Sequence, residues 1–213
     1  MKYVKPFLEY FRGFPAFTAN DARLFLRKNG ASSGYYMIFI HNLIRSSRAF
    51  GVKKGYYTLY DDPTIASFAF SPFYFGLETA LTYHNLWDYM TPISIITTKT
   101  VRSGQREILG RNVDVRRIQK DKFFGYSMVH YKDGFYMPIA DIEKTFIDSV
   151  YFHTIFGKEV YANMSRKIDK KKLDMYLRNY DEKFGTMARA RLRNARDDVI
   201  CAVATTGNKR CRK

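Results

Sequence analysis

The sequence predicts an α+β protein built in three parts, and three observations support this fold class. Residues 14–60 show the order helix, turn, helix and two-stranded hairpin. From about Ile93 the apolar spacing changes from helical to the alternation of strands, and from about residue 156 it becomes helical again. We therefore expect a winged helix-turn-helix at residues 1–60, a small mixed α/β domain with an antiparallel sheet at 61–155, and basic C-terminal helices at 156–213.

Three helices are expected in the first part. The first is an amphipathic segment near the N-terminus. The second follows Thr18, whose hydroxyl can accept a hydrogen bond from the free amides of a first helical turn, and it stops at Asn29-Gly30. Ser32 or Ser33 would cap the third helix, which runs to about Arg45. The core-facing residues of this third helix, by helical spacing, are Tyr36, Ile40, Leu43 and Ile44.

A short hairpin follows the third helix. Its two strands are joined by Lys53-Lys54-Gly55, so two ammonium groups are expected at its tip. A helix that follows a sharp turn fits the major groove of DNA, and a basic hairpin can lie on the flanking phosphates. This part of the sequence therefore predicts DNA binding.

The middle part is expected to contain a small antiparallel sheet with a helix at each end. After Asp61-Asp62-Pro63 we expect a short helix at 64–70 and a longer one at 73–85 that begins at Ser71-Pro72. The expected strands are 91–98, 113–119, 125–131 and 135–140. Asp141 would cap a helix at 142–156.

The last part is expected to be helical and basic. Asp169 would cap a helix at 170–180, and Thr186 one at 187–196 that aligns Arg189, Arg193 and Arg196. The tail beyond this helix is expected to fray. Both cysteines, Cys201 and Cys211, lie in that tail and no signal segment is recognisable, so we expect a reduced, cytoplasmic protein.

The positive charge is concentrated at the two ends of the chain. The formal net charge is +16, of which residues 1–60 carry +8, residues 61–155 carry −1 and residues 156–213 carry +9. A neutral middle between two basic ends favours a polyanionic partner over a need for solubility. No long apolar segment or basic amphipathic anchor indicates a membrane partner.

The candidate DNA-binding residues lie at the start of the second helix, at or on the third helix, on the hairpin and on the last helix. They are Thr18, Ser32, Ser33, Tyr35, Phe39, Asn42, Arg45, Lys53, Lys54, Arg189, Arg193 and Arg196. Hydroxyls and helix N-termini suit phosphates, and Asn can pair with adenine. Because no Arg occurs in the first two turns of the third helix, we expect modest base readout and a large contribution from phosphates and DNA shape. The C-terminal arginines would extend the footprint or face an acidic protein.

No catalytic, metal or cofactor site is expected. The histidines, which are His41, His84, His130 and His153, form no i, i+4 pair and have no neighbouring cysteine. Glu143-Lys144 lies on an expected helix, whereas a metal-dependent nuclease needs its acids and its lysine at one sheet edge. No glycine-rich phosphate loop or nucleophile elbow occurs. We therefore expect a protein that is not an enzyme.

Five segments in fixed order carry a resemblance to a known family. They are residues 55–59, 71–86, 95–99, 123–126 and 139–148, within a stretch of about 140 residues. Their order resembles the AbiEi-type antitoxins of type IV toxin–antitoxin systems, which are winged-helix transcriptional regulators. Where that family often has Ala-x-Pro-Glu-Lys, this chain has Ala140-Asp141-Ile142-Glu143-Lys144, so a proline is missing.

The resemblance implies an operon repressor that binds inverted repeats in its own promoter, as a monomer or a homodimer. It also implies a partner, a nucleotidyltransferase-like toxin that the protein opposes. Two alternatives stay open at this point. One is an interaction protein that neutralises the toxin by contact, with DNA binding secondary. The other, which the residues favour less, is a metal-dependent nuclease.

Overall fold

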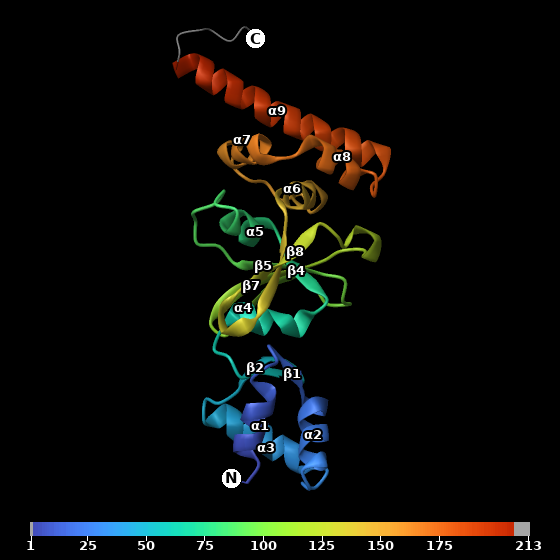
Figure 1. Cartoon of the computed structure of the whole chain (residues 1–213). Coiled ribbons are helices and arrows are strands. Elements are labelled where there is room, and N and C mark those ends of the chain that lie inside the picture. The colour runs from blue at the N-terminus through green and yellow to red at the C-terminus, as the bar shows by residue number, and fades with distance from the viewer. Residues whose placement is uncertain (1, 207–213) are drawn as a thin grey trace.

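The computed structural model describes residues 2–206, and the side chains of residues 2–195. It is a mixed α and β structure with one three-stranded and one six-stranded sheet. The molecule is elongated: residues 4–58 form one end, the six-stranded sheet lies in the middle, and the helices of residues 142–206 form the other end (Figure 1). The α+β class expected from the sequence is confirmed.

The N-terminal part has three helices and a small antiparallel sheet. The helices are α1 (Val4–Phe11), α2 (Ala19–Lys28) and α3 (Tyr35–Arg45). The strands are β1 (Phe17–Thr18), β2 (Phe50–Lys53) and β3 (Tyr56–Thr58), in the order β1-β3-β2. The three expected helices and the hairpin are confirmed. The two-residue strand β1 was not expected, because so short a segment has no measurable periodicity.

Aromatic side chains form a separate core for this part. Phe7 of α1 is fully buried, and its ring centre lies 5.4 Å from that of Phe17 and 5.0 Å from that of Phe39. The contacts are edge-on, the geometry that the charge distribution of aromatic rings favours. This cluster is distinct from the larger core of residues 66–195. The apolar stripe of α1 therefore faces the core of the N-terminal part, as expected for an amphipathic helix.

The middle part is built on the six-stranded sheet, whose order is β6-β7-β5-β4-β9-β8. Its elements are α4 (Pro63–Ala66), the 3-10 turns η1 (Ser67–Phe70), η2 (Lys120–Lys122) and η3 (Lys132–Gly134), β4 (Phe73–Phe75), α5 (Leu77–Tyr83), β5 (Ile93–Thr97), β6 (Gly104–Ile108), β7 (Arg111–Arg117), β8 (Tyr126–His130) and β9 (Tyr136–Ala140). β4 pairs with β9, and β5 with β7, in parallel. The expectation of an antiparallel sheet is therefore wrong, and the sheet is mixed.

One expected helix is partly a strand. Residues 73–75, expected to start a helix led by Ser71-Pro72, form β4 near the centre of the sheet, and α5 begins only at Leu77. All three residues of β4 are buried, with Phe73 opposite Thr97 and Tyr74 opposite Ile96. Burial on both faces suits a central strand and overrides the local helix-start signal.

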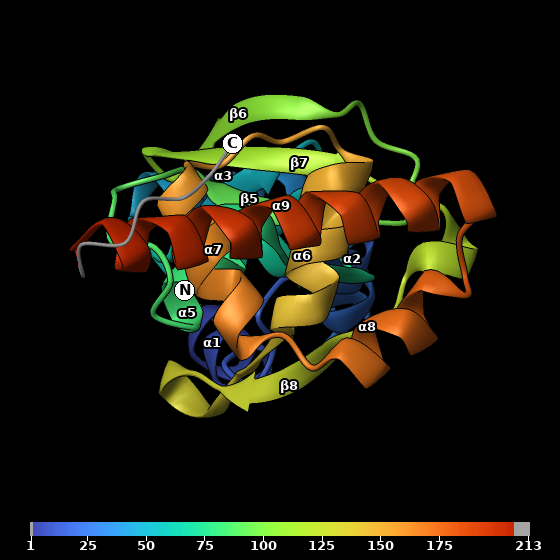
Figure 2. The same ribbon diagram turned by 90° about the horizontal axis from the view of Figure 1, so that it is seen from above.

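Four helices cover one end of the sheet (Figure 2). They are α6 (Ile142–Tyr151), α7 (Lys158–Lys167), α8 (Lys170–Leu177) and α9 (Glu182–Thr206). Asp141 and Asp169 accept hydrogen bonds from backbone amides at the starts of α6 and α8, so both expected caps are confirmed. Helix α7 was not expected. Helix α9 begins four residues before Thr186, which is therefore not its cap, and it continues to Thr206 where the tail was expected to fray.

The last residues of the chain lie outside the described part, and so does the expected frayed end beyond Thr206. The side chains of Cys201 and Cys211 also fall outside it. Within residues 2–206, none of the helices is long and apolar enough to cross a membrane.

Candidate nucleic-acid interface

Helix α2 and the turn after it set the position of α3. The Oγ1 of Thr18 accepts a hydrogen bond from the Asp21 amide (3.1 Å), and Asp21 Oδ2 accepts one from the Thr18 amide (2.8 Å). This reciprocal pair forms a capping box that fixes the first turn of α2. At the other end Gly30 has φ +85°, a conformation that favours glycine, and the Ala31 amide bonds to the Leu26 carbonyl at 2.9 Å. Thr18 is half-buried here and holds α2 in place.

The buried and exposed faces of α3 are rotated by about one residue position from the faces expected from the sequence. Phe39, Ile40 and Leu43 are buried, and Phe39 is 0% exposed. The prediction that Phe39 contacts DNA is therefore wrong, because its ring fills the space beside Phe7 instead. Conversely Ile44, expected in the core, is 41% exposed. The large aromatic ring of Phe39 sets the phase of the buried stripe, and a count of apolar residues alone did not show this.

The outer surface of α3 carries three residues that sequence reasoning missed, beside Arg45, which it predicted. Met37 and Ile38 are 61% and 62% exposed, and His41 and Arg45 are exposed as well. Met37, His41 and Arg45 stand at i, i+4 and i+8, so they line one side of the helix. The surface therefore combines the apolar side chains of Met37, Ile38 and Ile44 with an imidazole and a guanidinium.

The other residues predicted at or before α3 are exposed or half-buried. Ser32 and Ser33 are exposed before the helix, but neither caps it: the N-cap residue is Gly34, which has no side chain to bond the first amides. Tyr35 is half-buried against the rings of Tyr3 and Phe39. Asn42 is also half-buried. Of the predicted set, Ser32, Ser33 and Arg45 are the residues that α3 and its preceding turn expose most freely.

The two hairpin lysines have different surroundings. Lys54 is exposed at the turn, as expected. The turn itself is fixed to the start of α2, because the Gly55 carbonyl accepts a hydrogen bond from the Ala19 amide (2.9 Å). Lys53 does not project from the tip: its Nζ lies 4.2 Å from the ring centre of Tyr56 and 4.4 Å from that of Phe70. Lys53 thus lies at the junction between the hairpin and the middle part.

Two more cations lie at that junction. Lys99 Nζ is 5.2 Å from the Tyr56 ring centre, and Arg106 Cζ is 5.4 Å from that of Phe70. Burial of the Lys53 ammonium, followed by the charges of Lys99 and Arg106, lowers the pKa of Lys53 to about 8. The charge count along the sequence gave no indication of this cluster, because its members are far apart in the chain.

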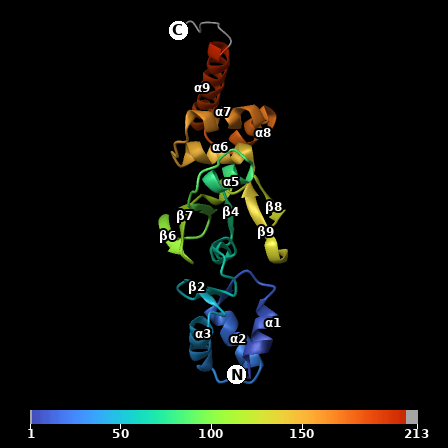
Figure 3. The ribbon, with the colours of Figure 1, turned by 90° about the vertical axis from the view of Figure 1, so that its left-hand side faces the viewer.

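The C-terminal arginines lie at the opposite end of the molecule from α3 (Figure 3). Arg189 Nε pairs with Asp174 Oδ1 at 2.9 Å, and Arg193 is exposed on α9. Arg196 belongs to the part of α9 whose side chains the structure does not describe. The structure therefore does not bring these residues together with α3 and the hairpin.

The motif Glu143-Lys144 belongs to a buried network. Lys144 and Asp148 are both 0% exposed, and Lys144 Nζ lies 2.5 Å from Asp148 Oδ1. The hydroxyl of Tyr74 donates to Asp148 Oδ2 at 2.8 Å. Burial lowers the pKa of Lys144 and raises that of Asp148, and the short contact between them opposes both effects. The pair joins α6 to β4 and is closed off from any phosphate of a polynucleotide.

Nearby acids of the same motif fix helix ends. Asp141 caps α6 and accepts hydrogen bonds from Lys172 Nζ (2.9 Å) and the Tyr176 hydroxyl (2.7 Å). Glu143 accepts a hydrogen bond from the Asp169 amide at 2.8 Å. In residues 2–195 no three His, Cys, Asp or Glu side chains are grouped as metal ligands would be.

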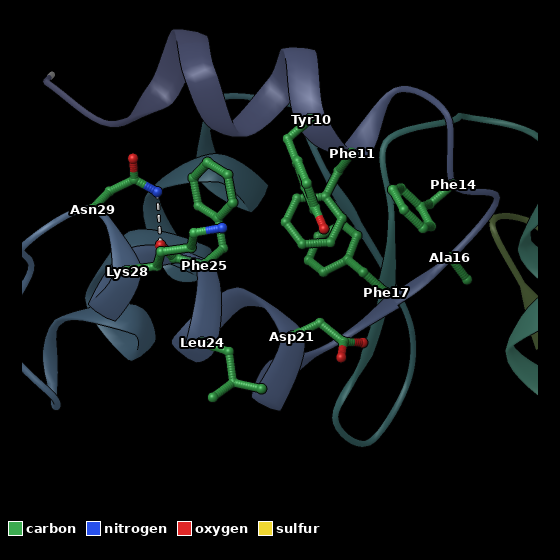
Figure 4. A pocket seen from close by; sticks show the side chains of 10 residues that line it. All are labelled: Tyr10, Phe11, Phe14, Ala16, Phe17, Asp21, Leu24, Phe25, Lys28 and Asn29. Carbon is green, nitrogen blue, oxygen red and sulfur yellow. Dashed lines mark hydrogen bonds between the residues drawn. The ribbon is translucent and has the colours of Figure 1, made fainter.

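A shallow groove lies between α1 and α2 (Figure 4). Its volume is about 550 Å³, and its walls include Tyr10, Phe14 and Leu24, which are 56%, 45% and 50% exposed. Asp21 and Lys28 stand at its rim. The groove is thus apolar with charges of both signs at its edge.

Comparison with known proteins gives a likeness of fold. No family model matches the sequence, and no curated protein matches it. The structure is similar to the crystal structure of the RV2827C protein from Mycobacterium tuberculosis, with a TM-score of 0.63 and 14% sequence identity. The match covers 92% of this chain and 77% of that chain. At this identity the comparison shows a shared fold.

Proposed function

We propose that the protein is a DNA-binding transcriptional repressor whose residues 1–60 act as a winged helix-turn-helix. The observation that carries the proposal is the outward face of α3, where Met37, Ile38, His41 and Arg45 are exposed after the six-residue connection from α2. The net charge of +8 in these residues suits a polyanion. The separate aromatic core supports treating them as one module.

In the proposed complex α3 lies in the major groove. His41 and Arg45 donate hydrogen bonds to base edges, and Met37 and Ile38 contact thymine methyl groups. Ser32, Ser33 and the exposed Lys54 contact phosphates, which position the module without reading sequence. Tyr35 and Asn42 are half-buried, so we expect them to contribute less than the exposed residues.

The resemblance to AbiEi-type antitoxins supports a more specific proposal. The protein would be the cytoplasmic antitoxin of a two-gene operon, binding an inverted repeat in its own promoter as a monomer or a dimer and opposing a nucleotidyltransferase-like toxin. Its middle and C-terminal parts, 61–155 and 156–213, would then be available for contact with that toxin. Two protomers on one face of the duplex would match the symmetry of an inverted repeat.

A gel-shift assay of the purified protein on its upstream region tests the proposal. We expect a shift that depends on sequence, requires no Mg²⁺ and causes no cleavage. The logarithm of the binding constant should fall with the logarithm of salt concentration by roughly 0.9 for each phosphate neutralised. A slope near zero would exclude duplex DNA as the partner, and nicking that depends on Mg²⁺ would favour the nuclease alternative.

A second candidate function is supported by the groove between α1 and α2. An exposed apolar groove bordered by Asp21 and Lys28 has the character of a surface that binds a protein. In this case the protein would act mainly by contact with a toxin. Co-purification with the product of a neighbouring gene, together with a failure to shift DNA selectively, would support this alternative over the repressor.

A further inference from the structure

Three cations surround two aromatic rings where the hairpin meets the middle part. Lys53 ends β2, Lys99 follows β5 and Arg106 lies in β6. We call Lys53, Lys99 and Arg106 the junction cluster. Their charged groups lie 4.2–5.4 Å from the ring centres of Tyr56 or Phe70. Two parts of the chain, separated by more than forty residues, thus place their positive charges together.

The charges of the junction cluster are not balanced. Among the described side chains, no carboxylate forms an ion pair with any of the three. The Nε of Arg106 is buried and has no hydrogen-bond partner within the described part of the chain. Aromatic faces offset only part of the repulsion between cations that are partly removed from water. An anion would balance the charge.

The position of the cluster agrees with the proposed DNA surface. Figures 2 and 3 show α3, β6 and β7 on one side of the molecule, with α1 and β8 on the other. Lys54, the exposed hairpin lysine, is the next residue after Lys53. The cluster therefore continues the surface of α3 and the hairpin toward the middle part.

We propose that Lys53, Lys99 and Arg106 form a phosphate-binding site, and that its ligand is a backbone phosphate of the duplex bound by α3. The assignment to DNA rests on the proposed function, whereas the phosphate chemistry does not. The Arg106 guanidinium would donate to one phosphate oxygen, and the two ammonium groups would contact the remaining oxygens. Occupation of the site would also hold the hairpin against the middle part, because its ligands come from both.

The site predicts a dependence of DNA affinity on pH. Lys53 has a pKa of about 8 without an anion, from burial and then from Lys99 and Arg106, and a bound phosphate would raise it. Free Lys53 then loses its proton as the pH rises from about 7 to about 9, so the affinity should fall about tenfold over that range. The charged and titratable groups that face Lys53 are Lys99, Arg106 and Tyr56, and the Phe70 ring also lies against its ammonium group.

Three variants in the full-length chain test this dependence by fluorescence anisotropy. Lys53→Arg keeps its charge throughout, so its affinity should change little with pH where that of the unchanged protein falls. Lys53→Gln should bind more weakly and be equally flat. Lys54→Gln is the matched control: it should lower affinity yet keep the pH dependence, because its neighbour remains titratable. A pH profile of the unchanged protein as flat as that of Lys53→Arg would overturn the proposal.

A second measurement does not depend on DNA binding. NMR of isotope-labelled lysine side chains gives the pKa of Lys53 alone, with inorganic pyrophosphate, and with a short duplex. A rise of about one unit or more with both ligands is the expected result. A rise with pyrophosphate alone would overturn the assignment to the DNA backbone and leave a site for free phosphate. No rise with either would overturn the site itself, whatever the gel-shift assay shows.

Discussion

The Lys144–Asp148 pair shows how a chemically suggestive motif can be structural. Both residues are fully buried, and the surrounding groups are the hydroxyls of Tyr74 and Tyr180. A buried ion pair gains little over apolar residues of the same size, yet either charge alone is costly in the interior. The adjacent residues 71–86, 123–126 and 139–148, which carry much of the family resemblance, meet around this pair, so we interpret them as determinants of the fold.

Removing one charge of the pair tests this interpretation. Lys144→Met should lower the free energy of unfolding by about 3–5 kcal/mol, because it leaves Asp148 buried without a cation. Lys144→Met/Asp148→Leu should recover most of that loss. Denaturant titration measures both. The exposed pair Arg189–Asp174 is the control, and Arg189→Ala should cost at most about 1 kcal/mol. If Lys144→Met lowered the free energy of unfolding by no more than this control, the interpretation of the pair as a determinant of the fold would be wrong.

Two exposed residues near the proposed interface should affect DNA binding differently. His41→Ala should weaken binding to the preferred sequence by about tenfold and leave non-specific binding nearly unchanged, because in the proposed complex His41 contacts the base edges. Lys54→Ala should weaken binding to all sequences alike and reduce the salt slope by about one. Anisotropy on specific and scrambled duplexes separates the two effects. An equal loss of affinity for both duplexes in His41→Ala would mean that His41 contacts the DNA backbone and not the bases.

At the scale of elements, the sequence predicted the structure best where local signals were strong. Thr18, Asp141 and Asp169 each cap a helix as expected. A short polar side chain just before an apolar helical repeat can accept hydrogen bonds from the free amides of the first turn, whatever the rest of the fold. Local reasoning failed at β4, where three consecutive buried aromatics have no period to identify. It also failed at β6. This edge strand is mostly polar, and Ile108 is its only buried residue, so it lacks the apolar alternation that identifies a strand.

The candidate site was predictable only in part for a related reason. Exposure of Ser32, Ser33, Arg45 and Lys54 follows from helix and turn positions that the sequence shows. The phase of α3, however, is decided by the packing of Phe39 against α1. The junction cluster depends on the pairing of β5 and β6 with β7, and on contact of the hairpin with the middle part. Parallel pairing, as between β5 and β7, joins segments whose contact no local pattern encodes.

The turn before β8 provides a test at this scale. Gly125 has φ +74°, and a Cβ there would lie 2.8 Å from the Cβ of Lys144. Gly125→Ala should therefore destabilise the protein through both backbone strain and the displacement of α6. Gly110 has a similar φ of +71° but no described atom within 4 Å of such a Cβ, so Gly110→Ala reports the strain alone. That control should cost about 1–2 kcal/mol, and Gly125→Ala about 1–3 kcal/mol more. Equal losses would mean that the turn does not pack tightly on α6.

At the scale of the whole molecule, the two basic ends form separate surfaces. The helices of the N-terminal part and α9 lie at opposite ends, with the six-stranded sheet between them (Figures 1 and 3). Charges farther apart than about 8 Å are largely screened at physiological salt. The positive charges of α9 should therefore contribute little to binding the duplex that we propose for α3, and this surface is available to another partner.

The double variant Arg189→Gln/Arg193→Gln tests this separation. It should change the affinity for DNA by less than about threefold and leave the salt slope the same within error, because neither residue would contact phosphate. Anisotropy across a salt series is the measurement. A slope reduced by about two would instead restore these arginines to the DNA footprint.

The central claim is that α3 reads DNA sequence, and selection of duplexes from a random pool tests it most directly. The unchanged protein should enrich a short motif, arranged as an inverted repeat and containing A·T pairs whose thymine methyls Met37 and Ile38 contact. The variant Met37→Ala/Ile38→Ala/His41→Ala should fold and lose that motif while retaining weak, salt-sensitive binding. Enrichment of no motif by the unchanged protein, or of the same motif by the variant, would contradict the account.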